Sequence, residues 1–515
     1  MIDGELIVEG KPFRILGAEI HNSSSSTPKA TAESFKRVAS LGANTVLAPI
    51  AWESIEPVEG EFDFTLATSL LDEANANGLK LIPLWFGSWK NGMSSYVPGW
   101  VKKDTVRFPR AATAATGHIE HLTPFAAEVG QADARAFAAL MGHFAAHDQA
   151  ATIVMVQVEN EAGLLGDSRD RSELAEGVWS EAVPERIAEA AQAQSGSHTW
   201  RGLFGDRADE AMMAYGYASS VEVVAAAGRR QFDVPMIVNA WLDAIIDPEL
   251  PALASETIAV AGGAAPGDYP SGGPLSHTAT IWRAIAPSID LISPDIYFGP
   301  FDKTCTDFKS VSDALFIPEM RRSAVGVAQM FRAIGEHGAI GVSPFGVDSL
   351  RDDEKNFRRL RDAFGLLKMA SELLAAPYSG VRGFFLSPER PRETFTFGEF
   401  AIQAIAGATF FSETPEEPAY GLLIEIEPTK FVAIGRGFSL TFSAGSDVGA
   451  SLLHADERVF EEGHWQTVRR LNGDESGSGS FIRFPALEEA YEHPIVAFNT
   501  RLTGVVAFEL YTFDR

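Results

Sequence analysis

The feature that most constrains the fold is an alternation of short apolar segments with amphipathic helical stretches over residues 1–380. This alternation is typical of parallel strands joined by crossover helices. A run of eight such units favours a closed (β/α)8 barrel over an open doubly wound sheet. The eight expected strands are Phe13–Glu19, Asn44–Ile50, Leu79–Phe86, Thr152–Val158, Val234–Ala240, Ile289–Tyr297, Ala314–Glu319 and Ala339–Phe345.

The connections between these segments are uneven in length. We expect insertions after strands 3, 4 and 6, because barrel enzymes place insertions on the C-terminal face, around the substrate pocket. Residues 167–210 are acidic and helix-forming, which predicts a pocket wall or lid, and residues 262–277 form a Gly/Pro-rich loop before strand six. A helix predicted over Asp352–Ala376 is expected to close the barrel.

After about residue 380 the pattern changes to an alternation with a period of two. Short alternating segments separated by turns predict an all-β unit, and they lie at 422–427, 430–435, 438–443 and 505–511. The predicted fold class is therefore α/β: a (β/α)8 TIM barrel over residues 1–380, followed by a smaller β-sandwich-like C-terminal domain over 381–515.

The charge balance narrows the class of partner. The chain has 42 Lys and Arg against 69 Asp and Glu, a net charge of −27. Nucleic-acid binding needs a basic surface, so no nucleic-acid partner is expected. The same field disfavours anionic lipids and acidic polysaccharides, whereas a neutral sugar meets no repulsion. The oligomeric state stays open, and a homo-oligomer is compatible with the sequence.

The sequence predicts neither a membrane span nor a disulfide. No segment approaches the roughly 20 apolar residues that cross a bilayer. Cys305 is the only cysteine, so an intrachain disulfide is ruled out. The N-terminal segment MIDGELIVEGKPFRIL lacks the basic start and apolar run of a secretory signal. A cytoplasmic location is therefore expected.

Two glutamates stand at the C-terminal ends of expected strands. Glu161 follows strand four in VMVQVENEAG (154–163), and Glu319 ends strand seven in ALFIPEMRR (314–322). Barrel enzymes carry their catalytic groups at this face. Cleaving a glycosidic bond requires one carboxyl group to protonate the leaving oxygen and another to attack the anomeric centre. We interpret Glu161 as the acid/base and Glu319 as the nucleophile, against the alternative that each is a solvated loop residue.

Glu159 is a rival to Glu161 for the role of the acid. In a regular strand, residues two apart share a face, so both side chains would point into the barrel. Glu161 lies nearer the mouth, where substrate arrives, and this favours it. Glu159 would lie deeper and need a partner, for which Arg14 on strand one is a candidate.

Three other reaction types lack their motifs. No His-x-His or His-Glu-x-x-His pair marks a catalytic metal, and no glycine-rich phosphate loop follows a strand. The Gly-x-Ser-x-Gly turn of a serine nucleophile is missing from every expected strand-to-helix turn. Neither a metal nor another cofactor is expected.

At several points the sequence resembles the family-35 glycoside hydrolases, the β-galactosidase family of clan A of barrel glycosidases. The similar segments are GKPFRILGAEIHNSS (10–24), LGANTVLAPIAWESIEPVEGEFDF (41–64), VQVENEAG (156–163), PDIYF (294–298) and LFIPEM (315–320). The YPSGGP loop (269–274) and the C-terminal β domain resemble the bacterial branch of this family. The Asn-Glu pair together with the Glu-Pro-x-x-Gly-x-Phe-Asp segment makes the resemblance specific.

The resemblance implies a retaining exo-β-glycosidase that removes terminal β-galactose from a neutral oligosaccharide or glycoside and needs no metal. It implies that Asn160 binds the sugar 2-OH beside the acid and that Tyr297 hydrogen-bonds the nucleophile. Further candidate sugar contacts stand at strand ends: Trp241 as an aromatic platform, His21, Asn22, Trp89, Lys90 and Asn91. For His21 a structural role is nearly as well supported, and Trp85 could equally belong to the core.

The chain departs from the family at two places that contact the sugar. Ala48-Pro49 stands where many members have a tyrosine, and WFGSWKNG (85–92) has no glutamate where members have Cys-Ala-Glu-Trp. The alternatives are the same mechanism on a β-glucoside, β-fucoside or α-L-arabinopyranoside, or transglycosylation. A non-catalytic sugar-binding barrel is the alternative of another class, but simple binding does not need an opposed carboxylate pair.

Overall fold

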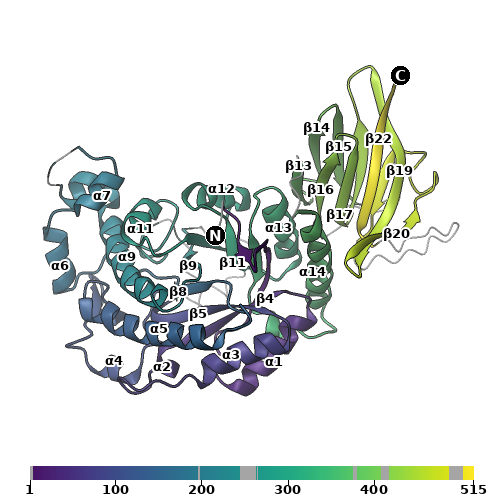
Figure 1. The fold of residues 1–515 in the computed structure, drawn as a ribbon. Coiled ribbons are helices and arrows are strands. Elements are labelled where there is room, and N and C mark those ends of the chain that lie inside the picture. The colour runs from purple at the N-terminus through teal and green to yellow at the C-terminus, as the bar shows by residue number, and fades with distance from the viewer. Residues whose placement is uncertain are drawn as a thin grey trace. The chain divides into compact units, whose positions relative to one another are not determined.

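The computed structural model describes residues 4–194, 196, 198–243, 263, 265–374, 380–407, 417–486 and 503–514 (Figure 1). By internal contacts the chain divides into two compact units, which are described separately below. The first is Met1–Met320 with Ile340–Ser349, and the second is Arg321–Ala339 with Leu350–Arg515. In the described residues, no helix is both long enough and apolar enough to cross a membrane.

The first unit contains a closed barrel of eight strands, all paired in parallel. The barrel strands, in chain order, are β3 (Ile15–Glu19), β4 (Thr45–Ala51), β5 (Lys80–Lys90), β8 (Val156–Asn160), β9 (Met236–Trp241), β10 (Leu291–Ile296), β11 (Phe316–Met320) and β12 (Gly341–Pro344). Each overlaps one of the eight expected segments, so the predicted (β/α)8 barrel is confirmed.

Apolar side chains fill the barrel interior. Ile15, Leu47, Ile82, Leu291 and Phe316 come from five different strands and belong to one buried cluster. Because side chains alternate along a strand, residues two and four positions further on from these face the same interior, nearer the C-terminal end. The apolar cluster therefore forms a floor below the strand ends.

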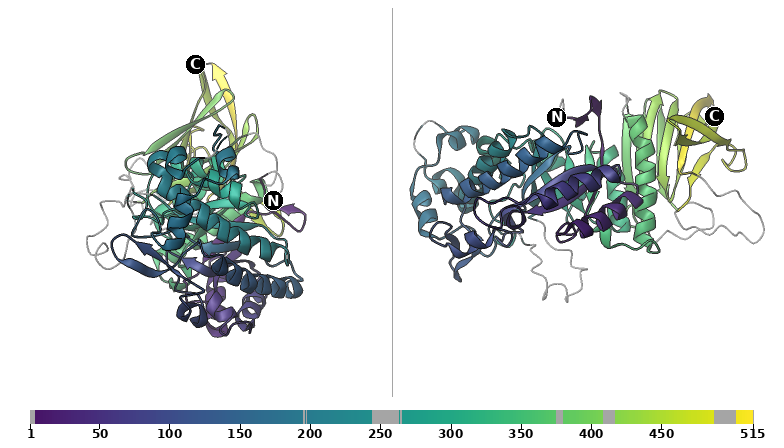
Figure 2. Two further views of the ribbon diagram at one scale, coloured as in Figure 1. Left: turned by 90° about the vertical axis from the view of Figure 1, so that its left-hand side faces the viewer. Right: turned by 60° about the horizontal axis from the view of Figure 1, so that its bottom comes forward.

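Helices and two small sheets surround the barrel. Helix α1 begins where the Thr27 hydroxyl accepts a hydrogen bond from the Ala30 N–H, with Pro28 at its first position. Helices α5 and α9 lie side by side on the outside of the barrel (Figures 1 and 2). The helices of the first unit are α1 (Pro28–Ser40), α2 (Trp52–Ile55), α3 (Thr65–Ala76), α4 (Gly99–Lys103), α5 (Ala127–His147), α6 (Glu173–Ser180), α7 (Glu185–Ala190), α8 (Trp200–Phe204), η1 (Gly205–Arg207), α9 (Ala208–Arg229), α11 (Ala279–Ile285), α12 (Phe301–Val311) and η2 (Val347–Ser349). The strands outside the barrel form two small sheets, β1 (Ile7–Val8) with β2 (Lys11–Pro12) and β6 (Arg110–Thr113) with β7 (Gly117–Leu122).

Long connections follow the third, fourth and fifth barrel strands. The connection after β5 holds α4, β6, β7 and α5, and the connection after β8 holds α6 to α9, which includes the helices expected in residues 167–210. The expected insertion after strand six is wrong: a short connection with α12 joins β10 to β11, and the third long connection lies between β9 and β10. Its Gly/Pro-rich loop therefore follows strand five, and the pocket-wall role of 167–210 stays a prediction.

The second unit packs two antiparallel sheets face to face around a core rich in phenylalanine, among them Phe384, Phe431 and Phe508. This confirms the all-β C-terminal part of the fold prediction. The sheet orders are β13-β16-β17-β22-β19-β20 and β14-β15-β18-β21. The bounds are β13 (Gly380–Leu386), β14 (Arg392–Phe397), β15 (Phe400–Ala406), β16 (Ala419–Glu427), β17 (Lys430–Arg436), β18 (Phe438–Ser443), β19 (Val448–Glu461), β20 (His464–Arg470), β21 (Phe481–Phe484) and β22 (Val505–Asp514).

Two helices that the sequence assigned to the barrel pack within this second unit. Helix α13 (Ala324–Gly335) approaches β13 closely, since a Cβ atom on Gly335 would lie 2.6 Å from the Gly383 Cα. Helix α14 (Lys355–Leu374), the predicted helix Asp352–Ala376, is tied to β17 by the Asp362–Arg436 ion pair at 2.6 Å. A division into domains 1–380 and 381–515 stays a proposal.

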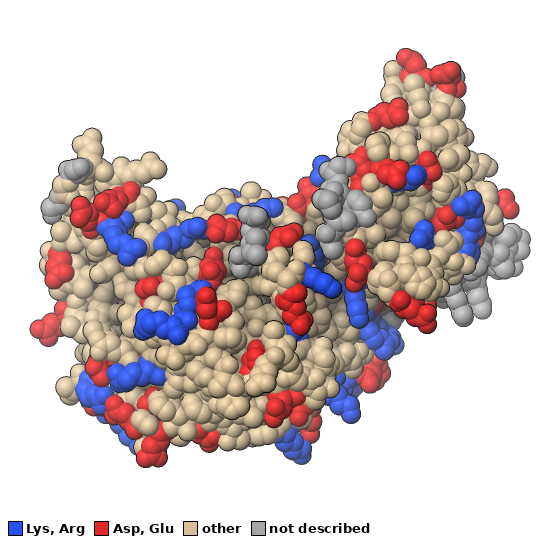
Figure 3. All heavy atoms as spheres, in the orientation of Figure 1, with Lys and Arg blue, Asp and Glu red and all other residues tan. Residues whose placement is uncertain are grey.

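On the face drawn in Figure 3, Lys and Arg side chains stand among Asp and Glu side chains and form no continuous basic surface. This interspersed arrangement limits local self-repulsion in a chain with a net charge of −27.

Candidate active site

Polar side chains gather at the C-terminal ends of the barrel strands. The set comprises Glu19 on β3, Lys90 on β5, Asn160 and Glu161 at the end of β8, Asn239 on β9, Asp295 on β10 with Tyr297 just beyond it, and Glu319 on β11. Because all eight strands are parallel, these ends meet at one mouth of the barrel, above the apolar floor.

The structure brings Glu161 and Glu319 together. One carboxylate oxygen from each, and one from Asp295, lie within 4.8 Å of one another. The two glutamates are 7% and 6% exposed, so their interaction is little screened by solvent. Two opposed, buried carboxyl groups at this separation can act on one bond from two sides.

Three donors hold the carboxylate of Glu319. The Tyr297 hydroxyl donates to Oε2 at 2.8 Å, while the amides of Asn160 and Asn239 donate to Oε1 at 3.3 and 3.4 Å. Burial and the charge of Glu319 raise the pKa of Tyr297 well above its ordinary value, so this hydroxyl stays a donor. These contacts fix the carboxylate in one orientation.

An irregularity in β11 aims Glu319 into the barrel. Phe316 belongs to the interior cluster, and an uninterrupted strand would turn a residue three positions later to the outer face. The register of β11 against β12 shifts between Ile317 and Met320, which provides the extra residue.

Glu161 lies where its carboxyl group keeps a proton near neutral pH. Burial, and then the charge of Glu319, raise the pKa of Glu161 to about 8. Its backbone N–H donates to Asn239 Oδ1 at 2.9 Å. The residue has φ 48°, a left-handed conformation that side chains other than glycine adopt at a cost, and that occurs often at functional sites.

Glu159 does not compete with Glu161 for the mouth. Its own φ of 61° breaks the strand alternation, so the expectation that both residues share one face is wrong. The Glu159 carboxyl group accepts hydrogen bonds from the N–H groups of Ser88 at 3.2 Å and Trp89 at 2.8 Å. Its neighbour is Asp133 of α5, whereas Arg14 lies at the opposite end of β3 and interacts with Glu5.

Asp133 and Glu159 form a buried pair that holds the end of β5. Asp133 accepts from Trp85 Nε1 at 2.7 Å and from the Ser88 hydroxyl at 2.6 Å. Burial raises the pKa of both carboxyl groups, and the charge of Asp133 raises that of Glu159 further. We infer that the pair shares a proton, because two adjacent buried carboxylates cannot both ionise at low cost.

Replacing Gly87 by Ala is expected to disturb this pair and the segment that follows. An added Cβ would lie 2.4 Å from Trp85 Nε1, 2.5 Å from Asp133 Oδ2 and 2.7 Å from Glu159 Oε1. Overpacking of this kind costs on the order of 1–3 kcal/mol. Both the Tm and the turnover should fall, because Lys90 lies three residues on. Gly177→Ala, where nothing lies within 4 Å, is the control, and an unchanged Tm for Gly87→Ala would contradict this packing.

The strand-three candidates divide into two groups. Lys90 donates from Nζ to Asn160 Oδ1 at 2.8 Å and also to the Asn91 side chain, so both Lys90 and Asn91 belong to the mouth. Trp89 does not: its ring packs against Tyr217 and its Nε1 donates to the Leu122 carbonyl. The expectation that Trp89 contacts sugar is therefore not met, because the backbone turns this side chain under the insertion after β5. Trp85 is fully buried and belongs to the core.

The strand-one and strand-five candidates stand at the same end of the barrel. His21 pairs through Nδ1 with Asp348 Oδ1 at 2.8 Å, and its side chain is 39% exposed. The buried Asn22 Oδ1 has no hydrogen-bond partner in the described part of the chain. Trp241 ends β9, two residues after Asn239, and is partly exposed. Their contacts with sugar stay predictions.

Three members of the site were not expected from the sequence: Glu19, Asn239 and Asp295. Asn239 Nδ2 bridges Asp295 Oδ2 at 2.8 Å and Glu319 Oε1, and burial raises the pKa of Asp295 well above its ordinary value. A usable signal was present, since in VNAW and SPDIY a polar residue interrupts an apolar strand near its C-terminal end.

The close carboxyl groups of Glu161, Asp295 and Glu319 offer oxygen atoms that a cation could bind. Both oxygens of Glu319 already accept hydrogen bonds from Tyr297, Asn160 and Asn239. The ammonium group of Lys90 provides positive charge, which lowers the pKa of Glu161 against the effect of burial. The donors therefore favour a hydrogen-bonded carboxylate over a metal ligand.

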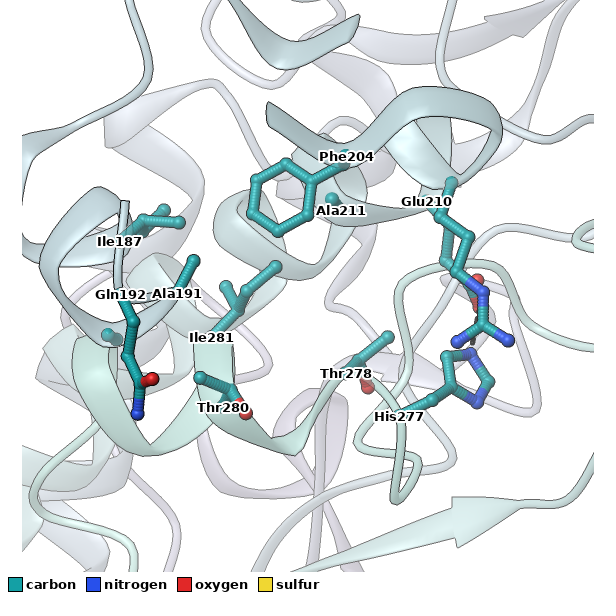
Figure 4. A pocket seen from close by; sticks show the side chains of 12 residues that line it. Ile187, Ala191, Gln192, Phe204, Glu210, Ala211, His277, Thr278, Thr280 and Ile281 are labelled. Atoms are coloured by element: carbon teal, nitrogen blue, oxygen red, sulfur yellow. Dashed lines mark hydrogen bonds and ion pairs between the residues drawn. The ribbon is translucent and has the colours of Figure 1, made fainter. Parts of the chain in front are cut away.

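A separate cavity of about 310 Å³ lies among α7, α9 and α11 (Figure 4). Ile187, Phe204 and Ile281 line its apolar part, and Glu210 and His277 pair at 3.0 Å on the opposite side. Glu210 also accepts from the Tyr269 hydroxyl. None of the strand-end carboxyl groups lines this cavity, so we give it no part in the chemistry.

Comparison with known proteins identifies two regions. Residues 5–244 match the family described as glycosyl hydrolases family 35, and residues 360–483 match a domain of unknown function, DUF5597. A β-galactosidase of Xanthomonas manihotis is 28% identical over 176 residues, which cover 32% of this chain and 26% of that relative. The chain therefore spans far less than the length of the curated relative it matches.

Many solved structures have similar folds, and two of them serve as examples. One is a β-galactosidase from Bacillus circulans, 14% identical, with a TM-score of 0.49, covering 72% of this chain and 58% of that one. The other is the catalytic domain of a β-amylase from Paenibacillus polymyxa, 11% identical, with a TM-score of 0.48, covering 68% and 97%. With TM-scores this low, neither structure supports a conclusion about the activity of this chain.

Proposed function

We propose that this chain is a retaining exo-β-galactosidase acting on neutral glycosides, in keeping with the match of residues 5–244 to family 35 of the glycosyl hydrolases. The observation that carries this proposal is the arrangement of Glu161 and Glu319. Two buried carboxyl groups have oxygens within 4.8 Å of each other; burial and the charge of Glu319 raise the pKa of Glu161, and three donors hold the carboxyl group of Glu319.

The separation of the two carboxyl groups supports retention of configuration. Retaining glycosidases keep their carboxyl groups about 5–5.5 Å apart, whereas inverting enzymes need about 6.5–9.5 Å to admit a water molecule. One oxygen of Glu161 and one of Glu319 lie within 4.8 Å of each other, which favours the closer, retaining arrangement.

The proposed reaction takes two displacements. Glu319 attacks the anomeric carbon with an oxygen lone pair while Glu161 gives its proton to the departing glycosidic oxygen, which leaves a glycosyl ester on Glu319. Ionised Glu161 then takes a proton from water, the water oxygen attacks the anomeric carbon, and the Glu319 carboxylate departs. Tyr297 and Asn160 keep the nucleophile oriented, and Asn160 is placed to meet the 2-OH.

The galactose preference and exo action rest on the family and on the name of the matched relative. The altered segment 85–92 keeps other glycons open as alternatives, and transfer of the sugar to an acceptor would use the same first step. A cytoplasmic location is part of the proposal, since Cys305 is buried and the sequence has no second cysteine.

The test is a rate panel combined with the anomeric form of the first product. Initial rates would be measured on nitrophenyl β-galactoside, β-glucoside, β-fucoside, β-xyloside and α-L-arabinopyranoside. Proton NMR of the released sugar before mutarotation should show the β-anomer. Release of the α-anomer would contradict retention, a preference for another glycon would replace galactose, and no turnover on the panel or on natural β-linked oligosaccharides would contradict the proposal.

A further inference from the structure

Among the described residues, no protein donor meets the carboxyl group of Glu19 at the barrel mouth. Glu19 ends β3 and is 1% exposed, and neither Oε1 nor Oε2 has a hydrogen-bond partner in the described residues. Its backbone is ordinary strand, since its carbonyl accepts from the Gly346 N–H and its register partner is Leu47. The side chain, and not the backbone, is the unusual feature.

The side chain of Glu19 faces the space above the apolar floor. Ile15, four residues earlier, belongs to the interior cluster, and positions four apart in a regular strand share a face. The charged groups that act on Glu19 are those of the mouth, namely Glu319, Lys90, Glu161 and Asp348. Burial and the three acids raise the pKa of Glu19 well above its ordinary value, whereas Lys90 opposes them.

A buried carboxyl group without partners is costly, and structures rarely keep one without a reason. Lys90, the cation that acts on Glu19, does not meet the need, because its hydrogen bonds go to Asn160 and Asn91. Another buried acceptor at the mouth, Asn22 Oδ1, also lacks a partner in the described part of the chain. The shared requirement is for a ligand that brings hydrogen-bond donors.

A pyranose supplies such donors as hydroxyl groups. If Glu161 and Glu319 flank its anomeric carbon and Asn160 meets its 2-OH, the hydroxyls of the non-reducing side are the ones left to be bound. We propose that Glu19 determines glycon specificity by binding hydroxyl groups on the non-reducing side of the sugar. This inference rests on the proposed function and adds a residue that recognises the substrate.

The inference is tested with Glu19→Ala and Glu19→Gln on substrates that lack one hydroxyl each. Removing a hydrogen bond to a charged group should lower kcat/KM on the β-galactoside by about 10- to 100-fold. On the deoxy-galactoside that lacks the hydroxyl bound by Glu19, among the 3-deoxy, 4-deoxy and 6-deoxy compounds, the same substitution should have little effect. An equal loss on every substrate, or no loss on any, would overturn the inference.

A stability measurement separates recognition from a structural role. Glu19→Gln removes a buried ionisable group that has no hydrogen-bond partner among the described residues, so its Tm at pH 8 should equal or exceed that of the wild type. The matched control is Glu56→Gln, because Glu56 is also buried but accepts from Trp52 Nε1 and the Gly60 N–H. That variant should lose stability and keep the glycon preference. A lower Tm for Glu19→Gln with an unchanged preference would assign Glu19 a structural role.

Binding without turnover keeps this test independent of the proposed activity. Calorimetric titration of Glu319→Gln protein with methyl β-galactoside and its deoxy analogues, with and without Glu19→Ala, repeats the comparison. If the wild type hydrolyses none of the substrates, yet these titrations show the selective loss of binding, the proposed function fails and the role of Glu19 stands. Titrations that are unaffected by Glu19→Ala overturn that role whether or not the wild type is active.

Discussion

Replacing Glu319 by Gln is expected to lower kcat/KM on the preferred glycoside by about 10⁴-fold or more, as for the loss of a covalent nucleophile. An amide cannot attack the anomeric carbon, so the glycosyl ester does not form. The amide is nearly isosteric and can still accept from the Tyr297 hydroxyl, so the fold should persist. Initial rates, circular dichroism and Tm of the purified variant are the measurements.

Chemical rescue identifies the atom that attacks. In Glu319→Gly, azide can enter the vacated space and attack the anomeric carbon directly, which would yield the α-glycosyl azide. Glu56→Gln, which lies outside the mouth, should give no azide product. Substantial turnover by Glu319→Gln of verified mass would contradict the assignment and direct attention to Asp295, whose carboxyl group lies in the same cluster.

Replacing Glu161 by Gln is expected to slow hydrolysis by an amount that depends on how readily the leaving group departs. General acid catalysis contributes about 10²–10⁴-fold, so turnover of alkyl glycosides and disaccharides should fall by that factor. A 2,4-dinitrophenyl glycoside should lose much less in its first step, because its leaving group departs without a proton. Similar losses on both substrates would contradict the acid role of Glu161.

The pH dependence gives a second test of Glu161. Its pKa is raised from 4.5 to about 8, so the proton needed for the first step is present at neutral pH and is lost as the pH rises through about 8. The kcat/KM of the wild type on an alkyl glycoside should therefore decline above that pH. In Glu161→Gln this decline should be absent, and its persistence would assign it to another group.

The barrel and the carboxyl pair could be predicted because both depend on local signals. Each strand is a short apolar segment followed by turn residues, and parallel connectivity places every strand end at one mouth. The strand-end positions of Glu161 and Glu319 follow from that rule, and the resemblance of their segments to family 35 singled them out. Their distance could not be predicted, because it depends on the left-handed backbone at Glu161 and on the register shift in β11.

Other parts of the site depend on contacts between segments far apart in the sequence. The partner of Glu159 is Asp133 on a helix outside the barrel, and no pattern within the strand indicates it. The bridging position of Asn239 arises only when β9, β10 and β11 are neighbours. Trp89 was misplaced for the same reason, since the insertion that covers it is specified by residues about thirty positions later.

The buried carboxyl groups of the mouth also couple folding to proton binding. Glu19, Glu159, Glu161 and Asp295 have raised pKa values, so the folded chain keeps protons that the unfolded chain releases near pH 4–5. Their contribution to stability is fully present below the unfolded pKa and is lost as the pH rises through the folded values. Asp167 acts in the opposite sense, since its pKa is lowered from 3.8 to about 2. Its contribution to stability is present above pH 3.8 and is lost as the pH falls through about 2. The thermodynamic optimum of this protein is therefore expected in mildly acidic solution, where the mouth is neutralised and the surface ion pairs are still intact.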